Sequence, residues 1–212
     1  MMETAAYLFD MDGTLLDSMG MWVHVGDDFL EKMGIPDPDH LGAEVITMSM
    51  RQSVQFFREK FHLPQSEQEL MDKVNAMVEE RYFHSLPAKP GAKELLERLS
   101  RQGKTLVLAT ATDRYLAEAA LRRTGMLSYF SRIFTCGEMD LPKDDPAFFQ
   151  KAAAQLQLSP QQITVVDDAL YAVRAARAAG CQVIGVADGE NLPDRPQMAL
   201  LANRFLPTLA AF

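Results

Sequence analysis

Residues 6–14 read Ala6-Tyr7-Leu8-Phe9-Asp10-Met11-Asp12-Gly13-Thr14, an apolar run that ends in two aspartates, a glycine and a threonine. Apolar residues in a row without alternation are typical of a strand that is buried on both faces of a parallel sheet. Ligands bind at the carboxyl ends of such strands, where Asp10 and Asp12 lie and Gly13 permits a sharp turn. The segment therefore predicts a strand leading into an acidic site, although Asp-Gly-Thr is also a common turn sequence without function.

Four more apolar runs have the same character, at residues 105–109, 132–135, 163–166 and 182–186. Helical patterns follow at residues 113–124, 145–156 and 169–179, and Gly125, Ser159-Pro160 and Gly180 mark their ends. Strands that alternate with helices predict an α/β fold with a Rossmann-like, doubly wound parallel sheet.

Residues 17–87 interrupt this alternation. They contain almost no β-branched run and predict helices at residues 21–33, 49–61 and 67–84. Prolines from Pro87 onward mark the return to alternating strands and helices. We therefore expect a helical domain of residues 17–87, inserted into an α/β core domain of residues 1–16 and 88–212.

The composition limits the classes of partner. Of the 212 residues, 21 are Lys or Arg and 29 are Asp or Glu, so the net charge of −8 disfavours nucleic acid and anionic membranes. Cys136 and Cys181 are too few for a disulfide framework and are expected to be buried free thiols. No run reaches the roughly 20 apolar residues of a membrane span. We expect a cytoplasmic protein, monomeric or weakly dimeric.

The end of the second predicted strand offers groups suited to an anion. Thr110 supplies a hydroxyl, and Ala111 and its neighbours supply backbone N–H groups at the start of a helix. A purely structural explanation exists as well, because Thr112 or Asp113 is expected to cap that helix.

Two further chain segments carry charge near the same sheet edge. Lys143 precedes a predicted helix and, taken alone, would be a solvated surface lysine. The pair Asp167-Asp168 follows an apolar strand and opens a helix, where negative charge is favourable in itself. Each feature has an ordinary explanation, but their convergence on one sheet edge indicates a functional site.

Together these motifs resemble the haloacid dehalogenase-like (HAD) hydrolases, in the branch with a helical cap that contains phosphoglycolate phosphatases and β-phosphoglucomutase. The resemblance covers essentially the whole chain, so the inserted helical domain would be the cap. The family's four motifs stand here as Asp10-Met11-Asp12-Gly13-Thr14, Thr110, Lys143 and Asp167-Asp168. Asp144 stands where a proline usually follows the lysine.

The resemblance implies a Mg²⁺-dependent phosphatase that hydrolyses a small phosphorylated metabolite through an aspartyl-phosphate. Asp10 would be the nucleophile, and Asp12 would act as general acid and then as general base. The carboxylates of Asp10 and Asp168 and the backbone carbonyl of Asp12 would bind Mg²⁺, with Asp167 as a further ligand directly or through water.

Thr110, Ala111 and Lys143 would bind the phosphoryl oxygens and offset their charge. β-Phosphoglucomutases carry a histidine ten residues after the acid/base aspartate, and this chain has Trp22 there, which favours water as the acceptor over a phosphosugar mutase. A non-enzymatic scaffold that binds a phosphorylated ligand would be expected to lack Asp10, Asp12 or Lys143, and all are present.

Substrate choice would then lie in the cap. Arg51 follows the segment of residues 47–50, where related enzymes carry a substrate-facing loop ending in arginine, but a solvated helix residue is the alternative. Trp22 is a second candidate contact. Several methionines, Met19, Met21, Met48 and Met50, would either line an apolar wall over the site or pack inside the cap.

Overall fold

The computed structural model describes residues 4–35, 45, 48 and 50–212. In that part of the chain, one parallel sheet has the strand order β3-β2-β1-β4-β5-β6. The strands are β1 (Ala6–Phe9), β2 (Thr105–Thr110), β3 (Arg132–Thr135), β4 (Ile163–Asp167), β5 (Gln182–Val186) and β6 (Arg204–Leu206). The order reverses between β1 and β4, which confirms the predicted Rossmann-like, doubly wound architecture.

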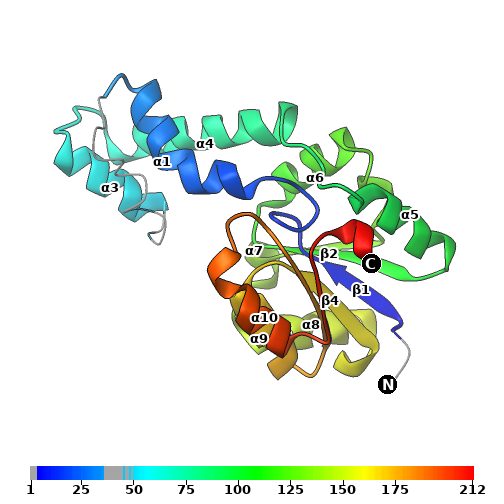
Figure 1. Cartoon of the computed structure of the whole chain (residues 1–212). Helices are drawn as coiled ribbons and strands as arrows, with labels where there is room; N and C mark the ends of the chain where they lie inside the picture. The colour runs from blue at the N-terminus through cyan, green and yellow to red at the C-terminus, as the bar shows by residue number, and fades with distance from the viewer. Residues whose placement is uncertain (1–3, 36–44, 46–47, 49) are drawn as a thin grey trace. The chain divides into compact units, whose positions relative to one another are not determined.

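Helices connect the strands and cover the sheet (Figure 1). They are α5 (Ala92–Arg101), α6 (Arg114–Arg123), α7 (Cys136–Met139), α8 (Pro146–Leu156), α9 (Leu170–Ala178) and α10 (Arg195–Leu201). Short 3₁₀ turns lie at Leu127–Tyr129, Pro160–Gln162, Leu192–Asp194 and Leu209–Ala211.

The apolar strands are buried on both faces. Leu8 of β1 is in register with Val107 of β2 and Val165 of β4, and all three join a core cluster with residues of α8, α9 and α10. The next residue of β1, Phe9, is also fully buried, and α5 packs against β2. Because successive side chains point to opposite faces, burial of both neighbours requires two covering layers.

Contacts divide the chain into two compact units, one of Met1–Ser18 with Leu86–Phe212 and the other of Met19–Ser85. The second unit contains α1 (Met19–Lys32), α3 (Met50–Lys60) and α4 (Glu67–His84). Phe29 of α1 stacks on Phe57 of α3 at 6.1 Å between ring centroids. Ser66 begins α4 with a reciprocal capping box to Glu69. None of the helices in the described residues is long and apolar enough to cross a membrane.

Most predicted elements match these bounds, and the differences have simple causes. The helix predicted at residues 67–84 is α4, whereas the one predicted at 21–33 begins earlier, at Met19. The helix predicted at 49–61 starts at a residue outside the described ones, and α3 begins at Met50. β6 was not predicted, because only three residues pair and one of them, Arg204, is exposed. Cys181 is buried as expected, but Cys136 is only half-buried.

The chain leaves the first unit and returns to it along two paired segments. The N–H of Asp17 donates to the carbonyl of Pro87, and the N–H of Lys89 donates to the carbonyl of Leu15, each at 2.9 Å. Leu16 and Ala88 form an antiparallel bridge between these hydrogen bonds. These contacts join the core segments that precede and follow the inserted unit, and they involve no residue of that unit.

The return segment ends at Gly91, where the backbone conformation and close packing require a glycine. Its φ is +82°, and a Cβ there would lie 2.6 Å from the backbone nitrogen of Ala210. Gly91→Ala should therefore lower the free energy of unfolding by about 2–4 kcal/mol, from left-handed strain plus a backbone clash. Gly103→Ala is the matched control, since φ is +71° but nothing lies within 4 Å. Equal losses in the two variants, measured by urea denaturation, would contradict the clash.

Candidate active site

The acidic segment after β1 folds into a compact turn. The N–H of Asp10 donates to the carbonyl of Val166 at 2.9 Å, so the chain is still paired with β4 where the first aspartate begins. The carbonyl of Met11 then accepts from the N–H groups of Leu15 and Leu16, at 2.8 and 2.9 Å. Gly13 has a φ of +82° inside this turn. The turn holds the segment at the carboxyl edge of the sheet.

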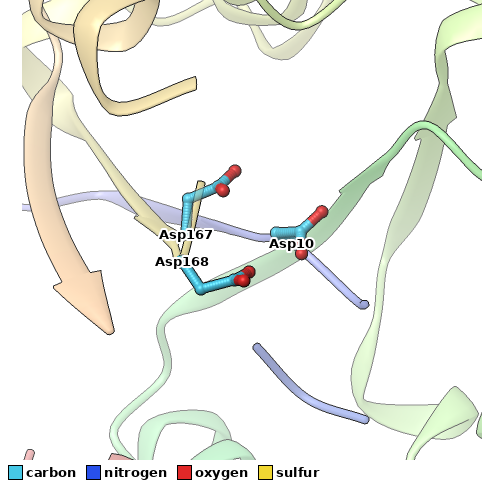
Figure 2. Close-up of side chains that lie close together, drawn as sticks. All are labelled: Asp10, Asp167 and Asp168. Atoms are coloured by element: carbon cyan, nitrogen blue, oxygen red, sulfur yellow. The ribbon is translucent and has the colours of Figure 1, made fainter. Parts of the chain in front are cut away.

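Asp10, Asp167 and Asp168 form a buried cluster whose carboxylate oxygens lie within 4.8 Å of one another. Figure 2 shows that the three side chains project from the neighbouring ends of β1 and β4, with the carboxylate of Asp168 directed toward Asp10. The cluster arises because β1 and β4 are adjacent at the point where the strand order reverses. Sequence separation is large, but strand pairing makes these residues neighbours.

Lys143 reaches this cluster from the segment before α8 and is only 3% exposed. Its Nζ donates to Oδ1 of Asp10 at 2.5 Å and lies 2.7 Å from Oδ2 of Asp167. The alternative that Lys143 is a solvated surface lysine is wrong, because its side chain is buried. Burial alone would lower the pKa of Lys143, but the two carboxylates outweigh burial and raise it well above its usual value, so the ammonium stays charged.

The carboxylates remain strained electrostatically despite this cation. Burial, with the charges of Asp167 and Asp12, raises the pKa of Asp10 to about 7 even though Lys143 opposes the shift. Burial and the neighbouring charges of Asp10 and Asp167 also raise the pKa of Asp168, against a hydrogen bond from Thr14. That hydrogen bond joins the Thr14 hydroxyl to Oδ1 of Asp168 at 2.8 Å.

This donor set fits a hard divalent cation. Three carboxylates offer oxygen ligands in one small buried region, where their mutual repulsion disfavours full ionisation. Oδ2 of Asp167 is buried and ion-paired with Lys143, yet it accepts no hydrogen bond from the described residues. Asp10, Asp167 and Asp168 are thus suited to hold a divalent metal ion.

Asp12 is held separately from that cluster. Its Oδ1 accepts from the hydroxyl of Ser18 at 2.7 Å, and its Oδ2 accepts from the hydroxyl of Thr112 at 2.6 Å. Asp113 is the N-cap residue of α6, in agreement with the expectation that Thr112 or Asp113 begins this helix, but its side chain makes no cap hydrogen bond. The Thr112 hydroxyl donates to Asp12, and such charge-assisted hydrogen bonds are the stronger ones.

The residues expected to bind phosphate lie beside these groups at the end of β2. Thr110 is 1% exposed, and its hydroxyl oxygen accepts the N–H of Thr112 at 3.1 Å. Ala111, the next residue, is exposed. The structure therefore brings together the strand ends that carry Asp10, Thr110 and Asp168, with Lys143 between carboxylates.

Behind the turn lies an ion pair that sequence reasoning did not find. Nζ of Lys89 donates to the carbonyl of Gly13 at 2.6 Å and to the carboxylate of Asp188, and both side chains are largely buried. Lys89 sits in the Pro-rich return segment, where nothing in the local pattern distinguishes it from a surface lysine. Its partner follows β5, more than ninety residues later in the chain.

Asn191 connects the same loop to the sheet edge that carries the acidic cluster. Its Nδ2 donates to the backbone carbonyls of Asp168 and Val186, at 2.8 and 3.0 Å. Its Oδ1 accepts from the N–H of Asp188 at 3.0 Å and from Nε of Arg195 at 3.2 Å. The amide side chain thereby fixes the backbone beneath Asp168.

The two candidate substrate contacts lie in the inserted unit and are described there by themselves. Arg51 is 67% exposed and forms an ion pair with Glu67 at 2.6 Å. The indole N–H of Trp22 donates to the hydroxyl of Tyr82 at 3.1 Å, and the two rings meet edge to face. The role of either residue toward a substrate stays a prediction.

The sequence profile of the haloacid dehalogenase-like hydrolases matches residues 7–186, which is most of the chain. The chain belongs to this family. The match spans most of β1, the inserted helices and the strand ends that carry the acidic cluster, and it ends before Asp188 and Asn191.

Several relatives of this HAD-like chain align over nearly its whole length. It is 26% identical to a phosphorylated carbohydrates phosphatase of Thermotoga maritima, over 92% of this chain and 93% of that protein. It is 25% identical to hexitol phosphatase B of Escherichia coli K12, over 90% of this chain and 88% of that protein. A predicted phosphoglycolate phosphatase from Haemophilus somnus has the same fold, with a TM-score of 0.80, 23% identity and coverage of 99% and 96%.

The raised pKa of Asp10 predicts how stability changes with pH. An unfolded aspartate has a pKa of 3.8, against about 7 in the fold. The folded state therefore holds an extra proton between these values, so stability from this group is lost as pH rises. In chelator, from about pH 4 to about pH 7, the wild type should lose stability relative to Asp10→Asn. Mg²⁺ should flatten that difference, because cation binding favours the ionised carboxylate.

Thermal melts of both proteins at a series of pH values, with and without Mg²⁺, measure this difference. Parallel stability curves for wild type and Asp10→Asn in chelator would contradict a raised pKa at Asp10.

Replacing Lys89 removes both its ion pair with Asp188 and its hydrogen bond to the Gly13 carbonyl, and the two losses should affect different properties. Lys89→Met leaves Asp188 buried without its cation and should cost about 3–5 kcal/mol of stability. Release of the Gly13 carbonyl should also lower kcat about ten- to a hundredfold by loosening the turn that positions Asp10. Lys93→Met, at an exposed position in α5, is the control and should change neither value.

A double variant shows whether Lys89 only stabilises the fold or also positions the turn at Gly13. Lys89→Met with Asp188→Leu should recover much of the lost stability, because no buried charge is left unpaired. It should not recover kcat, since the Gly13 carbonyl still lacks its donor. Recovery of both would show that the lysine supports the fold alone.

Proposed function

We propose that this phosphoric monoester hydrolase of the HAD family is a Mg²⁺-dependent phosphatase that hydrolyses a small phosphorylated metabolite through an aspartyl-phosphate. The observation that carries the proposal is the buried cluster of Asp10, Asp167 and Asp168 around Lys143. A cluster with so many like charges has no use in folding, because burial of carboxylates is costly. It is suited to a phosphoryl group and its counter-cation.

Asp10 is the proposed nucleophile. One carboxylate oxygen attacks phosphorus, an acyl-phosphate bond forms, and the bond from phosphorus to the ester oxygen breaks. Lys143 pairs with Oδ1 of Asp10 and holds the side chain in one orientation. The same ammonium is placed to meet negative charge that develops on the phosphoryl oxygens. Thr110 and the backbone of Ala111 are the proposed partners of the remaining phosphoryl oxygens.

Asp12 is the proposed general acid and base. Both of its oxygens accept from hydroxyl groups, those of Ser18 and Thr112. To donate a proton to the leaving oxygen, Asp12 must carry that proton and give up one of the two hydrogen bonds. It then takes a proton from the water that attacks the aspartyl-phosphate, which releases phosphate and restores the Asp10 carboxylate. The hydroxyl partners position Asp12 for this exchange.

Mg²⁺ is proposed to be held by the carboxylates of Asp10 and Asp168, with the backbone carbonyl of Asp12 and with Asp167 as a further ligand. When bound, the cation supplies positive charge against the phosphoryl group and among the ligands. Lys143 and the hydrogen bond from Thr14 keep the two carboxylates aligned.

Water is the proposed acceptor, and a phosphosugar mutase is not favoured. The position that carries histidine in β-phosphoglucomutases is Trp22, whose N–H is engaged with Tyr82 and which has no group to exchange protons. A scaffold without turnover is disfavoured because Asp10, Asp12 and Lys143 are all in place. The printed names of the two aligned phosphatases support phosphorylated small molecules as the substrate class.

The inserted unit is proposed to be the cap of residues 17–87 that selects the substrate, with residues 1–16 and 88–212 as the catalytic core. Arg51 stays a candidate anion contact there. Its ion pair with Glu67 lies at the surface and is thus weak enough to be exchanged for a substrate anion.

Removal of the nucleophile tests the mechanism. Asp10→Asn keeps the shape of the side chain but not its charge, so turnover of p-nitrophenyl phosphate should fall at least about a thousandfold. Asp17→Asn is the matched control, because Asp17 is an exposed aspartate of the same segment. Wild-type rates in the Asp10 variant would rule out the covalent intermediate proposed here.

Chelation tests the metal. EDTA should abolish turnover, and Mg²⁺ should restore it and raise the melting temperature by linkage. The rise in melting temperature should be smaller in Asp168→Asn, since that variant lacks one proposed ligand charge. Full activity in chelator would instead indicate metal-independent chemistry.

A further inference from the structure

Tyr171 lies in the first turn of α9, directly after the acidic end of β4. The residue is 51% exposed, so part of its ring faces solvent. Its hydroxyl end lies deeper, because burial is the largest cause that raises the pKa of Tyr171, against the charge of Lys143. The carboxylates of Asp167 and Asp10 also interact electrostatically with this hydroxyl. The phenol thus extends from α9 toward the charged cluster around Lys143.

Packing within the core explains why Tyr171 and Lys143 are neighbours. Lys143 precedes α8, Tyr171 lies at the start of α9, and these two helices pack against each other over one face of the sheet. Both residues belong to the compact unit of Met1–Ser18 with Leu86–Phe212, as do the ends of β1 and β4. Their proximity therefore involves no residue of the inserted helices.

The Tyr171 hydroxyl donates no hydrogen bond to any residue that the structure describes. It keeps its proton at neutral pH, because the ordinary pKa of a tyrosine is 10.0 and burial raises the pKa of Tyr171 further. Polar groups beside buried charge are usually hydrogen-bonded. The hydroxyl is thus a donor that is directed toward the candidate active site and is available to a ligand.

The phosphoryl group of the proposed substrate has room for a further donor. Its three terminal oxygens are strong acceptors. Lys143 already donates to Asp10 and is ion-paired with Asp167, so two carboxylates share its three N–H groups with any phosphoryl oxygen. The Thr110 hydroxyl and the backbone N–H of Ala111 are the other proposed donors. An additional neutral donor would strengthen phosphoryl binding without a change in the charge of the cluster.

Resting on the proposed function, we propose that Tyr171 is a further substrate-binding residue, whose hydroxyl donates a hydrogen bond to a terminal phosphoryl oxygen beside Lys143. A hydrogen bond to a charged acceptor is stronger than one between neutral groups. The competing role is structural, with the hydroxyl turned to Oδ2 of Asp167, which is buried and accepts no hydrogen bond from the described residues. The two roles differ in what the loss of the hydroxyl changes.

Tyr171→Phe removes the hydroxyl and keeps the ring. The probe is orthophosphate, which carries phosphoryl oxygens but no organic group, added to the protein in saturating Mg²⁺. Phosphate binding should raise the melting temperature of the wild type by linkage. The variant should need about tenfold more orthophosphate for the same rise, as expected for one hydrogen bond to a charged group. An unchanged phosphate requirement would overturn the inference.

Tyr129→Phe is the matched control, because Tyr129 is a partly exposed tyrosine that precedes β3 and so lies near the amino end of that strand. Its response to orthophosphate should equal that of the wild type. Without phosphate, Tyr171→Phe should melt at the wild-type temperature, since its hydroxyl has no partner to lose. A lower melting temperature without phosphate, together with a wild-type phosphate response, would assign the hydroxyl to Asp167 instead.

Turnover shows whether the contact is to the phosphoryl group itself. p-Nitrophenyl phosphate and acetyl phosphate share that group and differ in the rest of the molecule. Tyr171→Phe should lower kcat/KM about tenfold for both, because the same hydrogen bond is lost. A loss confined to p-nitrophenyl phosphate would show that Tyr171 contacts the organic group, and would overturn the phosphoryl assignment.

Failure of the inference is distinguishable from failure of the proposed function. Wild-type turnover of p-nitrophenyl phosphate with no effect of Tyr171→Phe leaves the phosphatase and removes the tyrosine contact. No turnover of any ester, with a weaker orthophosphate response in Tyr171→Phe than in the wild type, removes the phosphatase and leaves a phosphate site that includes Tyr171. No response of the wild type to orthophosphate would overturn the inference outright.

Discussion

Repulsion among carboxylates at one sheet edge is the constraint on which the site depends. Adjacent strands β1 and β4 end in Asp10 and in Asp167-Asp168, and parallel pairing leaves these side chains no room to separate. Lys143 offsets part of that repulsion, yet the pKa values of Asp10 and Asp168 remain raised. The cluster therefore carries more negative charge than Lys143 offsets, and the proposed divalent cation would balance it.

A second layer of polar contacts keeps the strained groups in place. Lys89 holds the Gly13 carbonyl, and Asn191 holds the Asp168 carbonyl, so the two acidic strand ends are anchored through their backbones. These backbone contacts leave the carboxylate oxygens to other partners, among them Lys143 at Asp10 and Thr14 at Asp168. Precise positioning of reacting groups depends on such supporting contacts.

The sheet and the acidic cluster were predictable from sequence because both follow from local patterns. Unalternated apolar runs indicated strands, and parallel strands bring their carboxyl ends together whatever lies between them in the chain. The hydroxyl of Thr112, the Lys89–Asp188 pair and Asn191 were not predictable. Their partners are distant in sequence, and a lone lysine or asparagine in a loop has the same local signature on a surface. β6 was not predicted because it has only three residues, too few for a periodic pattern in the sequence.

The insertion site explains how chemistry and substrate choice can vary independently. The chain departs after Ser18, which contacts Asp12, and returns before Lys89, which contacts Gly13. The backbone N–H of Asp17 donates to Pro87, and that of Lys89 donates to Leu15. These contacts belong to the core and need no residue of the inserted helices. Under the proposed function, binding energy from the unreactive part of the substrate would come from the inserted helices, whereas the bond would be broken by residues of the core, so that a change in the one set need not alter the other.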